Sequence, residues 1–261
     1  MHDATARRFP LTQITPGPAR APVDALGVAE MEKKEKCGVF GVWGVPEGAR
    51  LAYLGLYAQQ HRGQEAAGIA VTNGARIEGV VGMGLVPDVI TPRDLSQLCS
   101  VGDKGAIGHN RYSTAGGSLA CNSQPLIESY IGGQVAIGHN GNLVNCNALR
   151  RMFEERGHLF HTTSDTEVII HLLASPEQQN APDPLAATLR RLQGAFSLVF
   201  LFKDRIEAAR DPWGWRPLVI GRLPGGQHVV ASETVALDVA GAEYLREVEP
   251  GEIVTLSDAG L

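Results

Sequence analysis

The spacing of apolar and polar positions predicts strands, then helices, then strands again along the chain. Short apolar runs typical of strands lie at 37–44, 66–73, 75–82, 105–112 and 134–141. Apolar residues at helical spacing occupy 51–60, 145–156, 164–174 and 184–193. After Gly194, further strand-like runs lie at 195–202, 205–210, 216–221, 227–232 and 252–256. This order predicts an α+β fold in which antiparallel sheets are covered by helices.

Local signals mark three of the predicted element ends. Asn73-Gly74, between two strand-like runs, predicts a β-hairpin. The run Ser164-Asp165-Thr166-Glu167 predicts a capping box at the start of one helix. Asp183 followed by Pro184 predicts the N-cap and first position of the next helix.

Composition limits the classes of protein that remain. The 261 residues suffice for one large domain or two small ones, and 44% hydrophobic with 20% charged residues is ordinary for a globular protein. A net charge of −5 without a basic stripe predicts no nucleic-acid partner. The longest apolar run, 195–202, is too short to span a bilayer, so we expect no membrane partner. The four cysteines show no C-x-x-C pairing, which argues against structural zinc or a disulfide framework and favours a cytoplasmic location.

Residues 1–36 carry no targeting signal that the composition reveals. They lack the apolar segment of a secretory signal, and their acidic residues are unlike an acid-poor transit peptide. Pro10, Pro16, Pro18 and Pro22 prevent a long helix. We expect either a disordered tail or a removable leader, and composition alone favours the tail.

Candidate chemistry gathers around Cys37, which opens the run CGVFGVWG. Three later loops, HRGQE (61–65), GHNRYSTAGG (108–117) and GHNGNLVN (138–145), supply the polar partners that a thiol nucleophile needs. The last two follow apolar strands and are rich in glycine. We therefore expect them at strand ends, where the backbone turns sharply or approaches a ligand.

These segments carry polar groups that a simple turn does not require. Arg111 offers a planar guanidinium suited to a carboxylate. Asn140, with the unobstructed N–H of Gly141, offers the donors of an oxyanion hole. Asp165 lies at a predicted helix start, where the dipole favours its charge and where it can meet an ammonium group.

Taken one at a time, these residues have simpler explanations. Cys37 alone is more typical of a buried apolar thiol. Arg111 or Asp165 alone is more typical of a surface ion pair. Cys121, beside the 108–117 loop, has no role that we can derive. Only the joint arrangement favours a nucleophile at Cys37.

Three histidines and two tryptophans fit structural roles. His61, His109 and His139 lie in loops without a carboxylate or cysteine at recurring ligand spacing, so we expect satisfied loop histidines and no metal site. Trp213 and Trp215 are expected to pack beneath a turn.

Several separated motifs, in the same order, resemble the glutaminase domain of the amidophosphoribosyltransferases, a family of class II glutamine amidotransferases. The matching runs are C-G-V-F-G from Cys37, Q-H-R-G-Q-E (60–65), G-H-N-R-Y-S-T-A-G (108–116), H-N-G-N-L-V-N (139–145) and T-S-D-T-E (163–167). Three later runs resemble this family in particular: D-P-W-G-W-R-P-L (211–218), A-S-E-T (231–234) and Y-L-R-E-V-E-P-G-E (244–252). The resemblance covers 37–261.

The resemblance implies that Cys37 is the nucleophile and that its own freed α-amine is the general base. An α-amine has a pKa of about 7.7–8.0, close to working pH. Asn140 and Gly141 would bind the tetrahedral oxyanion. Attack on the side-chain amide of glutamine would release ammonia and leave a γ-glutamyl thioester, which water then hydrolyses.

The same resemblance implies the substrate contacts. Arg111 would bind the α-carboxylate of glutamine and Asp165 its α-ammonium group. Arg62 would support the site near the nucleophile. Tyr112 and Thr114 match a loop that closes over glutamine, and a weaker contact is expected of them.

The resemblance also implies the domain organisation and the partners. The fold would be the four-layer αββα sandwich of N-terminal-nucleophile hydrolases over 37–261, with 1–36 a disordered propeptide removed between Lys36 and Cys37. We expect 37–261 to lack the phosphoribosyltransferase domain, which would be supplied in cis or in trans. Mg²⁺ and, in some relatives, an iron–sulfur cluster would belong to that domain, and this chain would hold no cofactor. The complete homo-oligomer would be a glycosyltransferase that aminates phosphoribosyl pyrophosphate in the first step of de novo purine biosynthesis.

Two other functions stay open on the residues alone. One is the glutaminase domain of an amino-sugar or glutamate synthase, which the runs at 211–252 count against. The other is a non-catalytic regulatory domain that binds glutamine, which tight binding without turnover would support.

Overall fold

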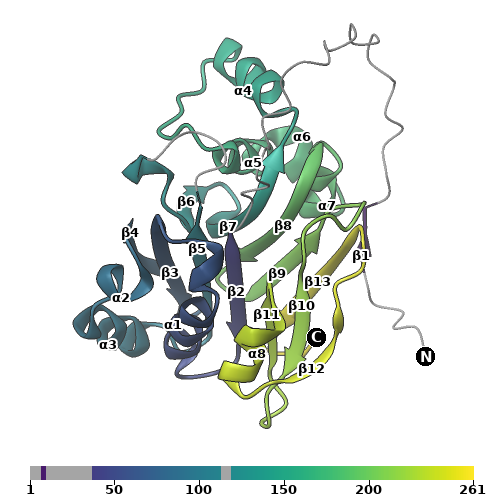
Figure 1. Cartoon of the computed structure of the whole chain (residues 1–261). Helices are drawn as coiled ribbons and strands as arrows, with labels where there is room; N and C mark the ends of the chain where they lie inside the picture. The colour runs from purple at the N-terminus through teal and green to yellow at the C-terminus, as the bar shows by residue number, and fades with distance from the viewer. Residues whose placement is uncertain (1–6, 10–36, 113–118) are drawn as a thin grey trace, which may run out of the picture.

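The computed structural model describes residues 7–9, 37–112 and 119–261. These residues form two antiparallel sheets enclosed between two layers of helices (Figure 1). The α+β class and the four-layer αββα arrangement predicted above are confirmed.

The first sheet has seven strands in the order β12-β10-β11-β2-β5-β3-β4, and each neighbouring pair is antiparallel. In chain order the strands are β2 (Gly38–Trp43), β3 (Ala66–Thr72), β4 (Ile77–Met83), β5 (Gly105–Arg111), β10 (Val219–Arg222), β11 (His228–Ala231) and β12 (Glu243–Glu247). Gly38 of β2 pairs with Asn110 of β5. The start of β2 therefore lies beside the end of β5, which brings Cys37 close to Arg111.

The second sheet has six strands in the order β1-β13-β9-β8-β7-β6, again all antiparallel. In chain order they are β1 (Arg7–Arg8), β6 (Leu126–Tyr130), β7 (Gly133–Leu143), β8 (Gly194–Leu201), β9 (Arg205–Arg210) and β13 (Glu252–Ser257). Gly141 of β7 pairs with Phe196 of β8. The second glycine-rich loop is thus built into a long central strand.

Each sheet is covered by its own group of helices. The seven-stranded sheet packs against α1 (Gly48–Ala58), α2 (Val86–Val89), α3 (Pro92–Val101) and α8 (Thr234–Ala240). The six-stranded sheet is covered by α4 (Cys146–Glu155), α5 (Asp165–Ala174) and α7 (Pro184–Leu189), with the short α6 (Pro176–Gln179) beside α5 and α7. Two 3₁₀ turns lie at Gln60–Arg62 and Ala120–Asn122.

Strand β2 illustrates how the sequence specifies these layers. Val39 and Trp43 belong to the core between the two sheets, whereas Phe40 and Val42 belong to the core between the sheet and its helices. Side chains of a strand alternate between its two faces. A strand buried on both faces consequently reads as a nearly continuous apolar run, as 37–44 does.

The predicted strands and helices are confirmed apart from their ends. The last predicted helix, for example, ends at Leu189 rather than at 193. The Asn73-Gly74 hairpin joins β3 to β4, and the Asp183 side chain caps α7 by accepting from the Ala186 N–H at 2.9 Å. The helical stretch at 86–101, the short helices α6 and α8, and the edge strands β6 and β12 lay outside the predicted segments.

The capping box predicted at 164–167 is half wrong. Ser164 does cap α5, because its hydroxyl accepts from the Thr166 N–H at 3.2 Å. Glu167, however, does not return to the N-cap backbone. Its carboxylate instead accepts the backbone N–H groups of His161 and Thr162, each at 2.8 Å. The Glu167 carboxylate therefore binds the loop that precedes α5 instead of the N-cap backbone, and it holds that loop against the helix.

The expectation of a disordered stretch at 1–36 is wrong at residues 7–9. Arg7 and Arg8 form β1 and pair with Ile253 and Glu252 of β13, at the sheet edge visible on the right of Figure 1. Phe9 is 1% exposed and belongs to the core beneath the helices. Composition did not reveal this, because one aromatic residue and a free sheet edge suffice to order so short a segment.

Candidate functional site

Residues from both sheets and one helix start line a common, narrow pocket. Its lining residues are Cys37, Arg111, Tyr112, Gln124, His139, Gly141, Ser164 and Asp165. Cys37 directly precedes β2, Arg111 ends β5, Gly141 lies in β7, and Asp165 begins α5. The topology therefore brings together most of the residues that the sequence singled out.

The Cys37 side chain is almost fully buried, at 6% exposed. Its sulfur lies 3.5 Å from the Tyr112 backbone N–H nitrogen, which donates to it. Burial raises the pKa of the Cys37 thiol above its ordinary value, and the Tyr112 hydrogen bond opposes that shift. The nearby guanidinium groups of Arg111 and Arg62 also oppose the rise in pKa, but together these contacts do not cancel the effect of burial. At neutral pH the sulfur thus carries its proton.

Asn140 and Gly141 lie on β7 beside the pocket. Asn140 is 2% exposed, and its Nδ2 has no hydrogen-bond partner among the described residues. A Cβ added at Gly141 would overlap the Ala195 carbonyl oxygen and lie 2.7 Å from the Phe196 Cα. Only glycine therefore fits here while β7 stays paired with β8. A buried, unused amide donor next to such a glycine is what an oxyanion hole requires.

Arg111 is held at the pocket wall by an acidic partner. Its side chain is 4% exposed, and Nη1 lies 2.8 Å from Oε1 of Glu65. Glu65 is part of the HRGQE loop and its N–H donates to the Arg111 carbonyl at 3.1 Å. These contacts orient the planar guanidinium, whose several donors allow it to bind a further carboxylate.

Asp165 is a buried carboxylate at the N-terminus of α5. Oδ2 accepts the Leu143 N–H at 2.9 Å, and Oδ1 lies 3.5 Å from Nδ1 of His139. Burial raises the pKa of Asp165, but the His139 ring and the Leu143 N–H outweigh burial and keep that pKa below its usual value. Asp165 is therefore an anion at working pH, as a partner for an ammonium group must be.

Three pocket residues, Gln124, His139 and Ser164, were missed as parts of the site, although Ser164 was predicted as a helix cap. Gln124 accepts the His139 N–H at 2.8 Å and donates to Thr166 Oγ1 at 3.0 Å. His139 Nδ1 lies 3.2 Å from the same hydroxyl, whereas its Nε2 has no partner among the described residues. We expected the hydrogen-bonding groups of His139 to be satisfied. This holds for its Nδ1 and not for its Nε2 among the described residues. Only the position of His139 in the GHNG run pointed to the pocket.

The neighbouring His109 is structural. It is completely buried, and its Nε2 lies 3.0 Å from the His139 carbonyl oxygen. Burial lowers the pKa of His109 to about 3, so the ring is neutral.

Arg62 supports Cys37 from outside the pocket lining. Its Nε donates to the Cys37 carbonyl oxygen at 2.8 Å, and its Nη1 forms an ion pair with Glu233. Glu233 lies 2.9 Å from His61 Nε2 as well. The A-S-E-T run is therefore connected to Cys37 through Arg62. Sequence alone did not indicate this, because the partners are distant along the chain.

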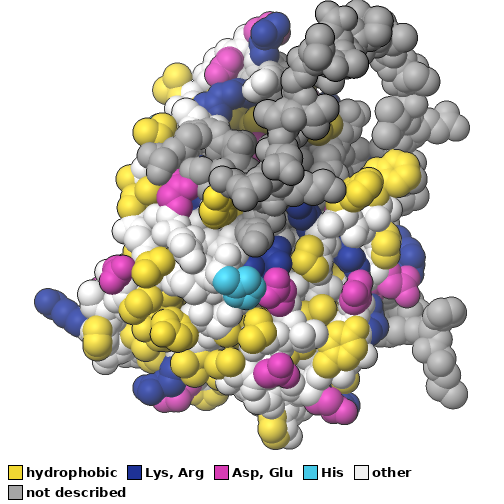
Figure 2. Space-filling view, in the orientation of Figure 1, with side chains coloured by type: hydrophobic (Ala, Val, Ile, Leu, Met, Phe, Trp, Pro, Cys, Tyr) yellow, Lys and Arg dark blue, Asp and Glu magenta, His cyan; other side chains and the backbone are white. Residues whose placement is uncertain are grey.

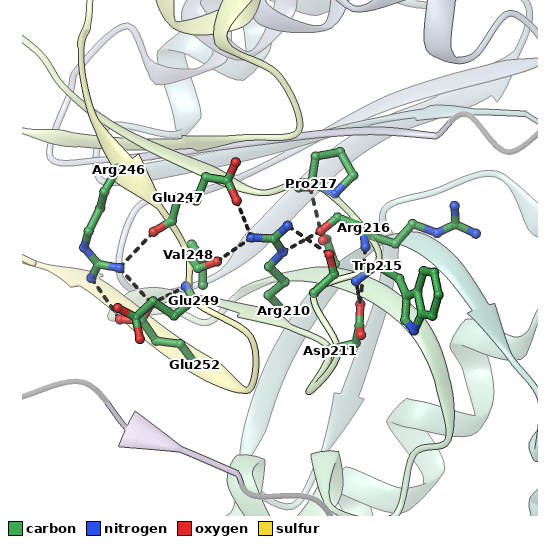
Figure 3. Close-up of polar contacts among 12 residues, drawn as sticks. Arg210, Asp211, Trp215, Arg216, Pro217, Arg246, Glu247, Val248, Glu249 and Glu252 are labelled. Carbon is green, nitrogen blue, oxygen red and sulfur yellow. Dashed lines mark hydrogen bonds and ion pairs between the residues drawn. The ribbon is translucent and has the colours of Figure 1, made fainter.

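The turn at 211–217 is fixed by two buried charges (Figure 3). Asp211 is fully buried and accepts backbone N–H groups from Phe196, Trp213, Trp215 and Arg216 at 2.9–3.3 Å. Beside it, the Arg210 guanidinium donates to three backbone carbonyl oxygens and pairs with Glu247 at 2.6 Å. Because Phe196 is the partner of Gly141 in the β7–β8 pair, this turn supports the strand that carries the candidate oxyanion donors.

The expectation that Trp213 and Trp215 pack beneath this turn is wrong. Their exposed fractions are 55% and 70%. The turn is held by Asp211 and Arg210, so the two indole rings are left facing outward.

Thr114 lies outside the described residues, so its predicted contact stays a prediction. The other predicted residues line the pocket, apart from two. Arg62 binds the Cys37 carbonyl oxygen from the 3₁₀ turn after α1, and Asn140 precedes Gly141 on β7.

Other features of the described residues bear on the remaining expectations. They contain no cluster of three or more His, Cys, Asp or Glu that could hold a metal ion. Within the same ranges, no helix is long and apolar enough to cross a membrane. Lys and Arg side chains lie beside Asp and Glu on the face shown in Figure 2. All four cysteines are free thiols.

Comparison with known proteins agrees with this geometry. Residues 109–239 match the family described as a glutamine amidotransferase domain. Amidophosphoribosyltransferase 1 of Arabidopsis thaliana, a chloroplastic protein, is 45% identical over 245 residues, which is 93% of this chain and 43% of that protein. Amidophosphoribosyltransferase of Staphylococcus aureus MRSA252 is 43% identical over 227 residues, or 87% of this chain and 46% of the relative.

The fold is shared as well. The structure of glutamine phosphoribosylpyrophosphate amidotransferase from B. subtilis, complexed with ADP and GMP, aligns with a TM-score of 0.77 and 43% identity, covering 86% of this chain and 48% of that one. This chain spans less than half the length of the two curated relatives. These similarities do not favour the amino-sugar or glutamate synthase alternative.

Proposed function

Because the chain belongs to the glutamine amidotransferase domain family, we propose that it hydrolyses glutamine at Cys37 and supplies the ammonia to a phosphoribosyl acceptor domain. The observation that carries this proposal is the single pocket shared by Cys37, Arg111, Gly141 and Asp165. It contains a sulfur, a cation, an oxyanion site and an anion, which together are complementary to glutamine.

The ends of glutamine are bound first. The Arg111 guanidinium, oriented by Glu65, receives the α-carboxylate. The Asp165 carboxylate, kept charged by its neighbours, receives the α-ammonium group. These two contacts direct the side-chain amide toward the sulfur of Cys37, which converts a bimolecular encounter into a positioned reaction.

The chemical step needs a base, because burial raises the pKa of the Cys37 thiol. Cleavage between Lys36 and Cys37 would free an α-amine on the same residue. That amine takes the thiol proton as the sulfur attacks the amide carbon. The Asn140 amide and the Gly141 N–H then stabilise the tetrahedral oxyanion.

Collapse of this intermediate completes the cycle. The amine returns its proton to the leaving nitrogen, ammonia departs, and a γ-glutamyl thioester remains on Cys37. Water hydrolyses the thioester, releases glutamate and restores the thiol. The steps proposed here use only groups of glutamine, water and the residues named above. Mg²⁺ and, where present, an iron–sulfur cluster would belong to the acceptor domain.

The relatives support the identity of the acceptor. The proteins similar to this chain over most of its length are named amidophosphoribosyltransferases, so we propose phosphoribosyl pyrophosphate as the acceptor. The acceptor domain would lie in cis or in trans, within a homo-oligomer that acts in purine biosynthesis. A cytoplasmic location stays a prediction, since plant relatives carry chloroplastic names.

The test combines mass spectrometry with an ammonia assay. We expect an active preparation to begin at Cys37 and to release equimolar ammonia and glutamate from glutamine. Cys37→Ala should abolish release, whereas Cys99→Ala, at a free cysteine of α3 outside the pocket lining, should not.

Two outcomes would contradict the proposal. One is turnover by full-length protein at the rate of trimmed protein, since no titratable amine exists at Cys37 in the uncut chain. The other is tight glutamine binding by trimmed protein without turnover, which would support a regulatory domain instead.

A further inference from the structure

Residues 7–9 make a specific set of contacts with the outer edge of the six-stranded sheet. Arg7 and Arg8 pair with Ile253 and Glu252 of β13, and the Phe9 N–H donates to the Gly251 carbonyl oxygen at 2.9 Å. The backbone of this segment thus extends the sheet by one strand, as in β-augmentation. We call residues 7–9 the docking strand.

Side chains of the docking strand bind both the sheet and the helix layer. The Arg7 guanidinium pairs with Glu207 of β9 and, at 3.0 Å, with Asp183 at the start of α7. It also donates to Thr255 of β13 at 3.2 Å. Because the Glu207 side chain is only 2% exposed, Arg7 contributes charge complementarity to a buried carboxylate.

Phe9 connects the docking strand to the strands behind the candidate active site. Its ring is 1% exposed and stacks on Phe196, with ring centres 6.2 Å apart and planes 12° from parallel. Phe196 pairs with Gly141 and donates its N–H to Asp211. The docking strand therefore completes the core on which the β7–β8 pair rests.

The chain between Phe9 and Cys37 is long enough to keep these two features independent. Residues 10–36 amount to 27 residues, which reach at most about 90 Å when extended, well beyond the width of a domain of this size. A cut between Lys36 and Cys37 removes none of the contacts made by Arg7, Arg8 or Phe9. After the cut, those contacts hold two chains together instead of two parts of one.

We propose that the leader stays on the protein after cleavage, bound non-covalently through the docking strand to β13, so that the mature form is a two-chain complex. This inference rests on the proposed cleavage at Lys36–Cys37. The occupant of the β13 edge is the chain's own leader. With the docking strand in place, β13 is paired on both sides, with β1 and β9, and offers no open edge to other chains.

The experiment cuts the chain without relying on its own chemistry. A protease recognition sequence is placed within 10–36 of the full-length chain, and the cut protein is examined by size-exclusion chromatography and mass spectrometry. We expect the leader fragment to elute with the main chain in equimolar amount. We also expect the melting temperature of the cut form alone to rise with protein concentration, because binding is now governed by mass action.

Adjacent arginines provide matched variants. Arg7→Ala removes the contacts with Glu207 and Asp183, and we expect it to lower leader retention at least 10-fold. Arg8→Ala, whose ion pair with Glu249 is exposed, should leave retention unchanged. Phe9→Ala should lower retention as Arg7→Ala does, because it removes the buried ring. Circular dichroism of the uncut variants shows whether each has folded.

Elution of the leader fragment free of the main chain in the cut wild type would overturn the proposal, as would equal retention in the Arg7→Ala and Arg8→Ala proteins. The engineered cut works equally in a Cys37→Ala background. Ammonia release is measured separately, on wild-type protein trimmed to Cys37. Loss of retention while that trimmed protein releases ammonia would refute only the docking strand, and retention while it releases none would refute only the proposed function.

Discussion

At the level of single residues, Cys37, the proposed nucleophile, needs activation. Burial raises the pKa of its thiol, and the hydrogen bond from Tyr112 and the two nearby arginines do not reverse that shift. A reactive cysteine with a lowered pKa would need no base. The geometry at Cys37 therefore requires a proton acceptor, and a freed α-amine on the same residue meets that need without any further side chain.

Gly141 tests whether the β7 strand holds the oxyanion site. In Gly141→Ala the added methyl group would overlap the Ala195 carbonyl oxygen and crowd Phe196. We expect ammonia release to fall about 100-fold or more, the size of effect seen when an oxyanion donor is displaced. Gly138→Ala is the matched control on the same strand, because its added methyl group meets nothing closer than 3.5 Å.

The readouts are steady-state ammonia release and thermal melting of both variants. We expect Gly138→Ala to keep both within a small margin of the wild type. Full activity in Gly141→Ala would contradict the role of Gly141 in binding the oxyanion.

Asp165 tests recognition of the substrate ammonium group. Asp165→Asn keeps an oxygen that can accept the Leu143 N–H but removes the negative charge. A hydrogen bond to a charged group contributes about 1.5–3 kcal/mol, so we expect KM for glutamine to rise roughly 10- to 150-fold. Asp183→Asn, at the start of α7, should leave KM unchanged since Asn caps a helix as well as Asp does. An unaltered KM in Asp165→Asn would exclude this contact.

At the level of elements, the site depends on how strands and turns are fastened together. The turn at 211–217 is the clearest case, because Asp211 accepts four backbone N–H groups in a fully buried position. One of them belongs to Phe196, the partner of Gly141. The carboxylate thus fastens the turn to the pair of strands that carries the candidate oxyanion site.

Asp211→Ala would leave these N–H groups without an acceptor. We expect the free energy of unfolding to fall by about 3 kcal/mol or more, since each unsatisfied buried group costs roughly 1–3 kcal/mol. Urea denaturation measures the loss, and the fluorescence of Trp213 and Trp215 reports on the turn. Asp204→Ala, an exposed residue between β8 and β9, is the control and should change little. Equal stability of the two variants would contradict the role assigned to Asp211.

The elements also show what the sequence can and cannot predict. Strands such as β2 and β5 are buried on both faces, and their apolar runs are readable directly. Strand β12 is mostly exposed, and β1 consists of two arginines, so neither has an apolar pattern. These strands are ordered by the edge that they pair with, which is a property of the folded sheet.

The site divides in the same way. Arg111 and Asn140 stood out because polar residues in glycine-rich loops have few structural reasons to be there. Cys37 stood out because it opens a strand-like run, and Asp165 because it lies at a predicted helix start. The Arg62–Glu233 ion pair could not be predicted from the sequence, because its two residues are separated by most of the chain. The place of Gln124 and His139 in the pocket, and the outward orientation of Trp213 and Trp215, also result from tertiary packing, which the sequence pattern does not show.

At the level of the whole molecule, the proposed activity depends on whether the leader is joined to Cys37. In the described structure of the uncut chain, Cys37 already lies in the pocket with Arg62 on its carbonyl oxygen. Cleavage therefore needs no refolding of the site. It changes one group, turning the amide nitrogen of Cys37 into an amine that can be protonated.

This change predicts the pH dependence of the trimmed enzyme. Asp165 stays ionised, because its pKa lies below the usual value, and the Cys37 thiol stays protonated, because its pKa lies above. A free α-amine ordinarily has a pKa of about 7.7–8.0, so we expect the amine of Cys37 to titrate within the range of the measurement. Only its neutral form accepts a proton, so kcat/KM should rise about tenfold per pH unit up to that pKa and level off above it.

The measurement is ammonia release by trimmed protein between about pH 6 and 8.5, with uncut protein as the control. Uncut protein should be inactive at every pH, because its Cys37 nitrogen is an amide. A profile that stays flat through this range would mean that a group other than the amine accepts the thiol proton. A rate that falls as the pH rises would mean that the proton is required on the base, which is incompatible with the amine acting as described.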